Sequence, residues 1–456
     1  MRRHAIIGRF GSGDRVRVPI ANDETASRLE LVASQRRLDH GIGQSLDDLA
    51  RLGIFPTEVG IDLLVFAAHV HAADTRISRQ TESQDTWTRE IHLAVPVSDP
   101  QRWADAIALL ERMLNFLTGD RWTISFRARP SQFMAIVPRK PRRLISPPLD
   151  SLSLLSGGLD SLIGAIDLLE GGQTPLLVSH AGDGASSNAQ TKLFDTLKRH
   201  YRGRSFDRLR LWMTFSKELV RGAGTEETTR GRSFLFFAVG AFAGSGLEDP
   251  FTLRVPENGL IAVNVPLDPL RLGALSTRTT HPFYIARWNE LLSNLGIRGR
   301  VENPYWDHTK GEMVAGCANA ALLKRLIPHS LSCASPTKGR WQGHGTEQCG
   351  YCLPCLIRRA SLHVGLRGAT DPTPYTLSDL RAHILDTRQA EGQQIRSFEF
   401  AIERLRDKPA LAGILIHKPG PLFDESPERQ IALAGVYRRG LEEVAALLSG
   451  VRTRPS

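Results

Sequence analysis

The 456-residue chain alternates between short apolar runs and longer stretches in which apolar residues recur at helical spacing. Residues 152–155 have the pattern of a buried strand, and residues 162–169 have that of a helix. The same patterns predict strands at 175–180, 208–215 and 259–265, and helices at 189–201 and 232–244. This alternation is typical of an α/β fold, with a parallel sheet between helices and a ligand site at the carboxyl ends of the strands. We therefore expect such a domain over residues 149–326.

The first 148 residues have a different pattern and predict a smaller α+β accessory domain. Ile6, Ile7 and residues 16–20 flank a glycine-rich turn and favour a β-hairpin. The pattern further predicts antiparallel strands at 60–71 and 87–96, which makes a helical Asp62 unexpected, a helix at 99–117 capped by Asp99, and a strand at 122–129. Nothing in this segment requires catalysis. We expect it to bind a partner protein, to cover a substrate or to form a dimer interface.

The end of the chain predicts a metal-binding module at 327–366 and a helical extension at 367–456. Within the extension, helices are expected at 378–406 and 427–448, with a rigid break at Lys418-Pro419-Gly420-Pro421. Ahead of the α/β domain, the basic segment 139–143 contains Pro141 and favours a solvated linker. We expect the extension to contact a partner.

A glycine-rich turn joins the first predicted strand of the α/β domain to its helix. Its sequence is Ser156-Gly157-Gly158-Leu159-Asp160-Ser161. Glycines let the backbone approach a phosphate, and the amides and dipole of the following helix attract the anion. Ser156 and Ser161 add hydroxyl donors, and Asp160 can help to hold Mg²⁺. The turn therefore predicts ATP and Mg²⁺ as ligands, although an ordinary capped turn would have a similar sequence.

Four of the five cysteines form the pattern C-x15-C-x2-C-x2-C, at Cys333, Cys349, Cys352 and Cys355. Thiolates at this spacing can converge on a tetrahedral ion, which predicts structural Zn²⁺. Two disulfides or an iron–sulfur cluster remain as alternatives. Cys317 lies outside the pattern, in a predicted helix at 312–326, and we expect it to be buried packing.

The glycine-rich turn resembles the signature of the PP-loop ATP pyrophosphatases, which also lack the Walker A lysine. Together with the cysteine pattern and the paired Arg358 and Arg359 after it, the turn resembles the 7-cyano-7-deazaguanine synthase family, QueC, over residues 149–365. The resemblance implies that ATP adenylates the carboxylate of 7-carboxy-7-deazaguanine, that pyrophosphate leaves, and that ammonia attacks the adenylate. In that family the product is first an amide and then a nitrile.

Two long extensions depart from that family, with about 148 residues before the turn and about 90 after the cysteine module. The whole arrangement, including segments 119–122 and 276–282, is most similar to QatC, the QueC-like component of the Qat anti-phage defence system. This resemblance implies that an amine of a partner protein can replace ammonia as the acceptor.

Further candidate residues lie outside the turn and the cysteines, and each also has a structural explanation. Ser179 and His180 end the second predicted strand, where we expect adenine recognition. Arg230 and Arg232 lie at the start of the apolar helix 232–244, where we expect contacts with the phosphates. A carboxylate and an amide before residue 259 can pair with the deazaguanine edge. Lys310 follows a capping Thr309 in a segment that resembles the family's Ser/Thr-Lys-x-Glu helix start, and it can offset substrate charge. The candidates are Asp160, Ser161 and Lys310 for catalysis, Ser179, His180, Arg230 and Arg232 for ATP, and Glu257 and Asn258 for substrate.

Charge and composition narrow the function only slightly. Lys and Arg exceed Asp and Glu by 58 to 48, which admits a polyanionic partner, but the basic residues are dispersed and ATP itself calls for positive charge. No apolar run of membrane-spanning length and no signal segment is present, so we expect a cytoplasmic protein without membrane contact. The rival functions are sulfur transfer to tRNA, which needs a reactive cysteine, and a non-catalytic ATP-binding scaffold.

Overall fold

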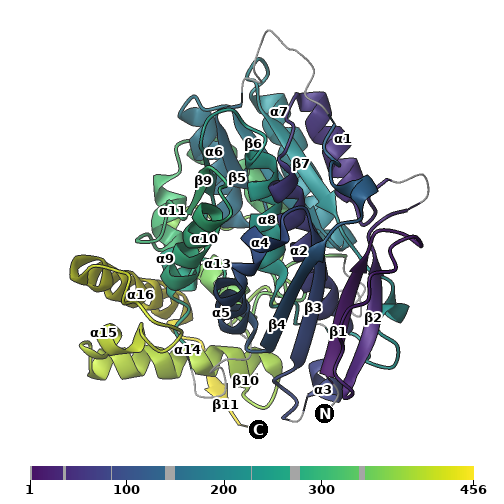
Figure 1. Cartoon of the computed structure of the whole chain (residues 1–456). Coiled ribbons are helices and arrows are strands. Elements are labelled where there is room, and N and C mark those ends of the chain that lie inside the picture. The colour runs from purple at the N-terminus through teal and green to yellow at the C-terminus, as the bar shows by residue number, and fades with distance from the viewer. Residues whose placement is uncertain are drawn as a thin grey trace.

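The computed structural model describes residues 3–33, 37–83, 85–138, 149–226, 228–267, 278–337 and 345–455. Over these residues the chain is a mixed α/β protein with two larger sheets, both parallel, which confirms the predicted fold class at that level. Figure 1 shows the four-stranded sheet at the lower right and the five-stranded sheet above it, with helices α2 and α8 between them.

The five-stranded sheet lies within residues 149–326, the segment for which the sequence predicts a parallel sheet. Its strands are β5 (Ser151–Leu154), β6 (Pro175–Ala181), β7 (Asp207–Trp212), β8 (Phe251–Arg254) and β9 (Gly299–Glu302), in the order β7-β6-β5-β8-β9. The helices between them are α6 (Leu159–Glu170), α7 (Gly184–His200), α8 (Arg232–Gly244), α9 (Gly259–Val263) and α10 (Pro282–Asn294). The strand order reverses beside β5, and ligands of open parallel sheets bind at such a reversal. The glycine-rich turn follows β5 and therefore lies there.

One element of this domain differs from its prediction. Residues 259–265 were expected to be a strand, but Gly259–Val263 is the short helix α9, and the strand is instead β8, just before it. A run of four apolar residues fits a buried strand or a buried helix equally well. The Asn258 side chain decides the outcome locally, because its oxygen accepts from the Ile261 amide and caps the helix.

The four-stranded sheet consists of β1 (Arg3–Arg9), β2 (Glu24–Glu30), β3 (Glu90–Val97) and β4 (Arg121–Ala128), in the order β2-β1-β3-β4 with every pair parallel. The expected hairpin and antiparallel pairing are therefore wrong. Its helices are α1 (Ile42–Leu52), α2 (Glu58–Arg76), α3 (Arg79–Glu82), α4 (Pro100–Ala104) and α5 (Ile107–Thr118). The predicted single helix at 99–117 is thus two helices, and Asp99 caps the first as expected.

Helix α2 replaces the strand that was expected at 60–71, so Asp62 is helical after all. The helix is buried almost all round, and a helix without a polar face has no helical periodicity to reveal it. Asp62 is tolerated inside because Arg129 and Ser98 donate hydrogen bonds to its carboxylate.

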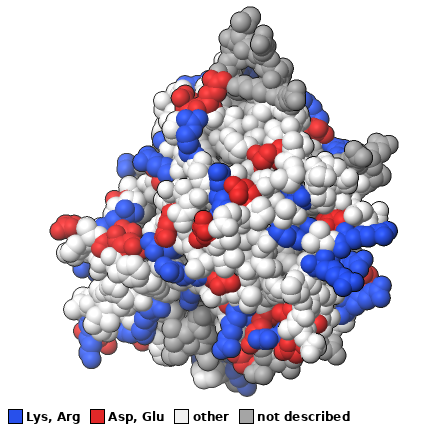
Figure 2. Space-filling model, in the orientation of Figure 1, with Lys and Arg blue, Asp and Glu red and all other residues white. Residues whose placement is uncertain are grey.

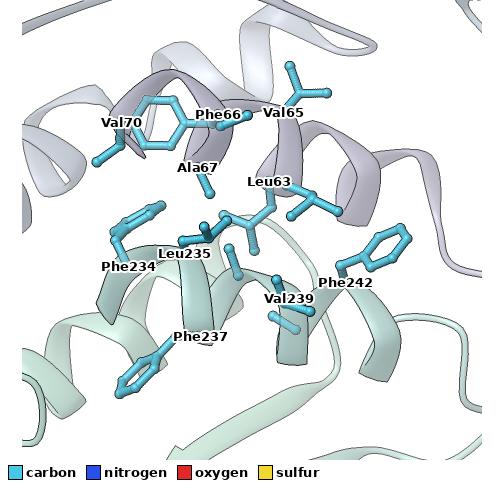
Figure 3. Close-up of a cluster of buried hydrophobic side chains, with 14 of the residues drawn as sticks. Leu63, Val65, Phe66, Ala67, Val70, Phe234, Leu235, Phe237, Val239 and Phe242 are labelled. Carbon is cyan, nitrogen blue, oxygen red and sulfur yellow. The ribbon is translucent and has the colours of Figure 1, made fainter. Parts of the chain in front are cut away.

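Helices α2 and α8 pack face to face and join the two sheets into one hydrophobic core. Figure 3 shows Leu63, Phe66 and Val70 of α2 directed toward Phe234 and Leu235 of α8. The Phe66 and Phe234 rings meet edge to face, with centroids 5.4 Å apart. The first 138 residues therefore share buried surface with the α/β domain.

The remaining helices carry the cysteine module and the C-terminal extension. They are α11 (Lys310–Gly316), α12 (Ala320–Leu326), α13 (Leu353–Gly365), α14 (Ala390–Asp407), α15 (Leu411–Leu415) and α16 (Pro427–Leu448), with strands β10 (Leu385–Asp386) and β11 (Thr453–Arg454) and 3-10 turns at Ser131–Phe133, Lys217–Leu219 and Ile327–His329. The helix at 427–448 has the predicted bounds, whereas the helix expected at 312–326 breaks after Gly316. The predicted linker at 139–143 and residues 276 and 277 lie outside the described residues.

The surface does not concentrate the net positive charge on the face that Figure 2 draws. Basic and acidic side chains are mixed over most of that face, with a denser basic group at its right edge beside β1 and β2. Among the described residues, no helix is long and apolar enough to cross a membrane.

Candidate functional site

The glycine-rich turn forms a tight loop between β5 and α6. Gly157 has a φ of +91°, a conformation that glycine adopts without strain, and it is closely backed by Ala189 and Gln190 of α7. Gly158 is the N-cap of α6 and offers no side chain to the first-turn amides, so the cap leaves these amides available to an anion. The hydroxyls of Ser156 and Ser161 lie 3.1 Å apart. The sequence-predicted donors are therefore gathered at one helix terminus.

Asp160 is the most constrained side chain of the loop. Its Oδ2 accepts from the Asn258 side-chain amide at 2.7 Å and from the Asn258 backbone amide at 3.0 Å. Its Oδ1 lies 3.0 Å from the Lys310 ammonium, and both partners of this ion pair are buried. Two predicted catalytic residues, 150 positions apart, thus meet directly. Asn258, which we expected at the substrate edge, instead holds Asp160 and caps α9.

Glu257 lies next to this network. Thr280 donates its hydroxyl to the Glu257 carboxylate, and the Asn303 side-chain amide donates to the Glu257 backbone carbonyl at 2.7 Å. Burial, reinforced by the nearby Asp160 charge, raises the pKa of Glu257 from 4.5 to about 7. A carboxyl of this kind exchanges a proton near neutral pH, which is what acid–base chemistry requires.

The four predicted metal ligands converge as expected. The Sγ atoms of Cys333, Cys349, Cys352 and Cys355 all lie within 4.8 Å of one another, and the cysteines form no disulfides. Amides also donate to the sulfurs, for example from Cys349 to the Cys333 Sγ at 3.4 Å. Four close thiols with amide donors suit a tetrahedral ion such as Zn²⁺. The cluster can therefore hold a metal.

Buried polar side chains fix the cysteine module to the loop. Arg358 is fully buried, and its guanidinium donates to the Ser330 hydroxyl at 2.9 Å and to the Ile327 carbonyl at 2.7 Å. Leu331, the residue after Ser330, donates its amide to the Gly157 carbonyl of the glycine-rich turn at 2.8 Å. The module thus lies directly against the glycine-rich turn.

One cavity of about 550 Å³ connects the loop, the network and the cysteine module. The C-terminal extension also lines this cavity, through Ala390 and Gln394 of α14. The cavity is large enough for a small-molecule ligand. Among the predicted site residues, it is lined by Ser156, Gly158, Leu159, Asp160, Ser161, Glu257, Lys310 and Cys352.

The residues predicted to recognise adenine have structural partners instead of facing this cavity. The Ser179 hydroxyl donates to the Leu155 carbonyl at 2.7 Å and ties β6 to the end of β5. His180 is buried between the rings of His71 and Phe236. Burial lowers the pKa of His180 to about 4, so its imidazole is neutral at physiological pH.

The two arginines at the start of α8 do not line the cavity either. Arg230 donates to the Thr118 carbonyl at the end of α5 at 3.2 Å and lies 4.0 Å above the ring of Trp87, which precedes β3, so its guanidinium contacts the N-terminal part of the chain. Arg232 lies over the Phe236 ring, and burial lowers its pKa. A basic residue at a helix start does not reveal which neighbour it meets.

Cys317 caps the end of α11 and is buried. Burial raises the pKa of its thiol to about 12, which keeps the thiol protonated and poorly nucleophilic. This agrees with the packing role expected from the sequence and weighs against a reactive cysteine at this position.

Two residues that shape the site, Gln190 and Glu443, carried no signal in the sequence. Gln190 of α7 donates to the Ser156 and His180 carbonyls and connects two strand ends. Glu443 of α16 contacts the start of α11. Both are polar residues on amphipathic helices, where a solvated position is the ordinary expectation. Only their contacts in three dimensions distinguish them: Gln190 is buried, and Glu443 is half-buried against α11.

Comparison of the chain with models of known protein families and with curated proteins gave no match.

Proposed function

We propose that the chain is an ATP-dependent ligase of the 7-cyano-7-deazaguanine synthase type. It would adenylate a 7-deazaguanine carboxylate, release pyrophosphate and form a carbon–nitrogen bond. One observation carries the proposal: the glycine-rich loop, Lys310, Glu257 and the cysteine module all border one cavity. The resemblance of both motifs to that family gives the substrate class.

In the first step, a substrate carboxylate oxygen attacks the α-phosphorus of ATP. The bond between the α-phosphorus and the bridging oxygen breaks, and pyrophosphate leaves with its electron pair. The first-turn amides of α6 and the hydroxyls of Ser156 and Ser161 are placed to stabilise that leaving charge. Lys310 offsets charge on the substrate carboxylate or the adenylate. Mg²⁺, which Asp160 can help to hold, would shield the phosphates when bound.

In the second step, a nitrogen nucleophile attacks the acyl carbon and AMP leaves. The nitrogen must lose a proton as the bond forms. Glu257 borders the same cavity and has a pKa near 7, so it can accept that proton. This role is an addition to the base-edge contact that the sequence suggested for Glu257.

The cysteine module supplies structure in this proposal. Zn²⁺ bound by the four thiolates would hold the start of α13 beside the cavity, where Cys352 is the N-cap residue of the helix. Free thiols of this kind persist in the reducing cytoplasm, which is where we place the protein.

The acceptor is ammonia or an amine of a partner protein in an anti-phage defence system, as the similarity to QatC implies. The lining residues contributed by α14 support a role of the extension at this cavity. Nucleic acid is not the favoured partner, because the basic residues are dispersed along the sequence and because ATP and an anionic substrate also call for positive charge.

The test is to incubate the purified protein with ATP, Mg²⁺ and 7-carboxy-7-deazaguanine, with and without ammonium, and to measure AMP and pyrophosphate. We expect substrate-dependent release of both. Amide or nitrile formed with ammonium would identify a free acceptor, and release with product formation only in the presence of a partner protein would identify a protein amine. ATP binding without release would favour a non-catalytic scaffold and overturn the ligase proposal.

A further inference from the structure

Helix α16 belongs to the C-terminal extension, yet it packs against both elements that hold Asp160. On one side it meets α9, the helix that Asn258 caps. The packing is close: a Cβ atom added to Gly259 would lie 2.8 Å from the Val436 side chain, and one added to Gly440 would lie 2.9 Å from the Leu260 Cβ. The position of Asn258 therefore depends on α16.

On its other side, α16 holds the start of α11. The Glu443 carboxylate accepts from the Thr309 hydroxyl through Oε1 and from the Gly311 amide, at 3.1 Å, through Oε2. These two donors are the residues immediately before and after Lys310. The residues on both sides of Lys310 are thus held by one half-buried side chain from a helix more than a hundred residues away.

A second contact from the same helix supports this arrangement. Arg439 lies one turn before Glu443 and donates to the Glu312 carboxylate at 2.6 Å and to the Asp307 carbonyl at 2.7 Å. Glu312 is itself the capping-box partner of Thr309. The first turn of α11 is therefore held by its own cap and by two side chains of α16.

We propose that Glu443 is a positioning residue for Lys310: it fixes the first turn of α11 so that the Lys310 ammonium stays 3.0 Å from Asp160 at the wall of the cavity. The C-terminal extension is then part of the nucleotide site and not an appendage to it. For its activity readout, this inference rests on the proposed ligase function.

The test is a double-mutant cycle with Glu443→Gln and Lys310→Ala. Glutamine keeps the size of the side chain but places an amide NH₂ against one of the two donors. We expect Glu443→Gln to lower kcat for pyrophosphate release by about tenfold to a hundredfold, with a smaller change in KM. The reason is that the displaced Lys310 ammonium acts on charge that develops during the reaction. In the Lys310→Ala background, Glu443→Gln should change kcat less than about twofold.

Glu442→Gln is the matched control, because Glu442 is the neighbouring residue and pairs with Arg438 on the exposed face of α16. It should behave like the wild type. Thermal melts check folding, and Arg439→Gln replaces Glu443→Gln in the cycle if the latter does not fold. Additive losses in the double variant would show a structural role only, and a fully active Glu443→Gln protein would equally overturn the inference.

A failure of the proposed function has a different outcome. If the wild type releases no pyrophosphate, the ligase proposal fails. The dissociation constant of Mg-ATP is then measured by calorimetry for the wild type, the two single variants and the double variant. Non-additive weakening of binding would still support the positioning role. Additive or absent effects, or no Mg-ATP binding by the wild type, would overturn it.

Discussion

Asp160 shows how a single carboxylate is oriented by groups that are far apart in sequence. One oxygen takes both donors of Asn258 and the other faces Lys310. A buried carboxylate needs such partners to remain charged. Its position in the loop could be predicted from local sequence, whereas its partners could not, because a contact across 150 residues leaves no periodic signal.

Glu257 gives a pH dependence that can be measured without a substrate. Because burial raises its pKa from 4.5 to about 7, the folded protein holds this proton more tightly than the unfolded chain does. The resulting stabilisation is fully present below pH 4.5 and is lost as the pH rises to about 7. The variant Glu257→Gln cannot ionise and keeps an acceptor for Thr280. We expect the difference in Tm between Glu257→Gln and the wild type to increase from pH 4.5 to about 7 and then to level off. Calorimetric scans in which the two Tm values change with pH in parallel would contradict this.

Gly157 and Gly172 provide a matched pair at the two ends of α6. Both have positive φ, +91° and +82°, so alanine should cost each about 1 kcal/mol of stability. Only at Gly157 would the new Cβ meet neighbours, 3.3 Å from the Ala189 Cβ, whereas it meets nothing within 4 Å at Gly172. We expect Gly157→Ala to abolish Mg-ATP binding in calorimetry and Gly172→Ala to preserve it. Equal affinities would remove the loop from the nucleotide site.

At the scale of elements, prediction succeeded for α8, an apolar helix that is buried almost all round, and for α16, which has an exposed polar face. The bounds of α8 and α16 match the sequence pattern, and the loop between β5 and α6 lies where expected. Prediction failed for α2 and α9, because a fully buried helix and a buried strand are both continuous apolar runs. The cavity wall from α14 was also not predictable, since it depends on how the extension folds back.

The cysteine module gives a prediction about α13. Cys355 is fully buried in its first turn, so Cys355→Ser should keep the cluster from holding a metal ion and should loosen the start of the helix. We expect metal content to fall and the Tm to match that of the wild type treated with a chelator. Cys317→Ser, also a buried cysteine, is the control and should keep its metal. Full metal content in Cys355→Ser, by elemental analysis, would show that this thiol is not a ligand.

At the scale of the whole molecule, α2 and α8 make the two larger sheets interdependent. The predicted boundary at residue 148 separates them in sequence, but the core passes through both. The composition of each segment could not show this, because an apolar helix face does not reveal its partner.

This shared core predicts how the protein unfolds. Phe66 is fully buried between Phe234 and Trp103, so Phe66→Ala should cost about 3–5 kcal/mol in the free energy of unfolding. In denaturant titrations, circular dichroism and tryptophan fluorescence should report one shifted transition. Phe400→Ala, at a half-exposed position, is the control and should shift it by no more than about 0.5 kcal/mol. A plateau seen by one probe only would show that the two sheets unfold separately.

The contact between α16 and α11 also has a consequence for folding during synthesis. The ribosome makes the chain from its N-terminus, so the glycine-rich loop emerges long before Glu443 does. Segments that have emerged can already fold. The ion pair of Lys310 and Asp160 can form earlier, but its support from α16 arrives only after residues 427–448 have emerged. A nascent chain, or one truncated by premature termination, would therefore carry the loop without the means to hold its lysine in place.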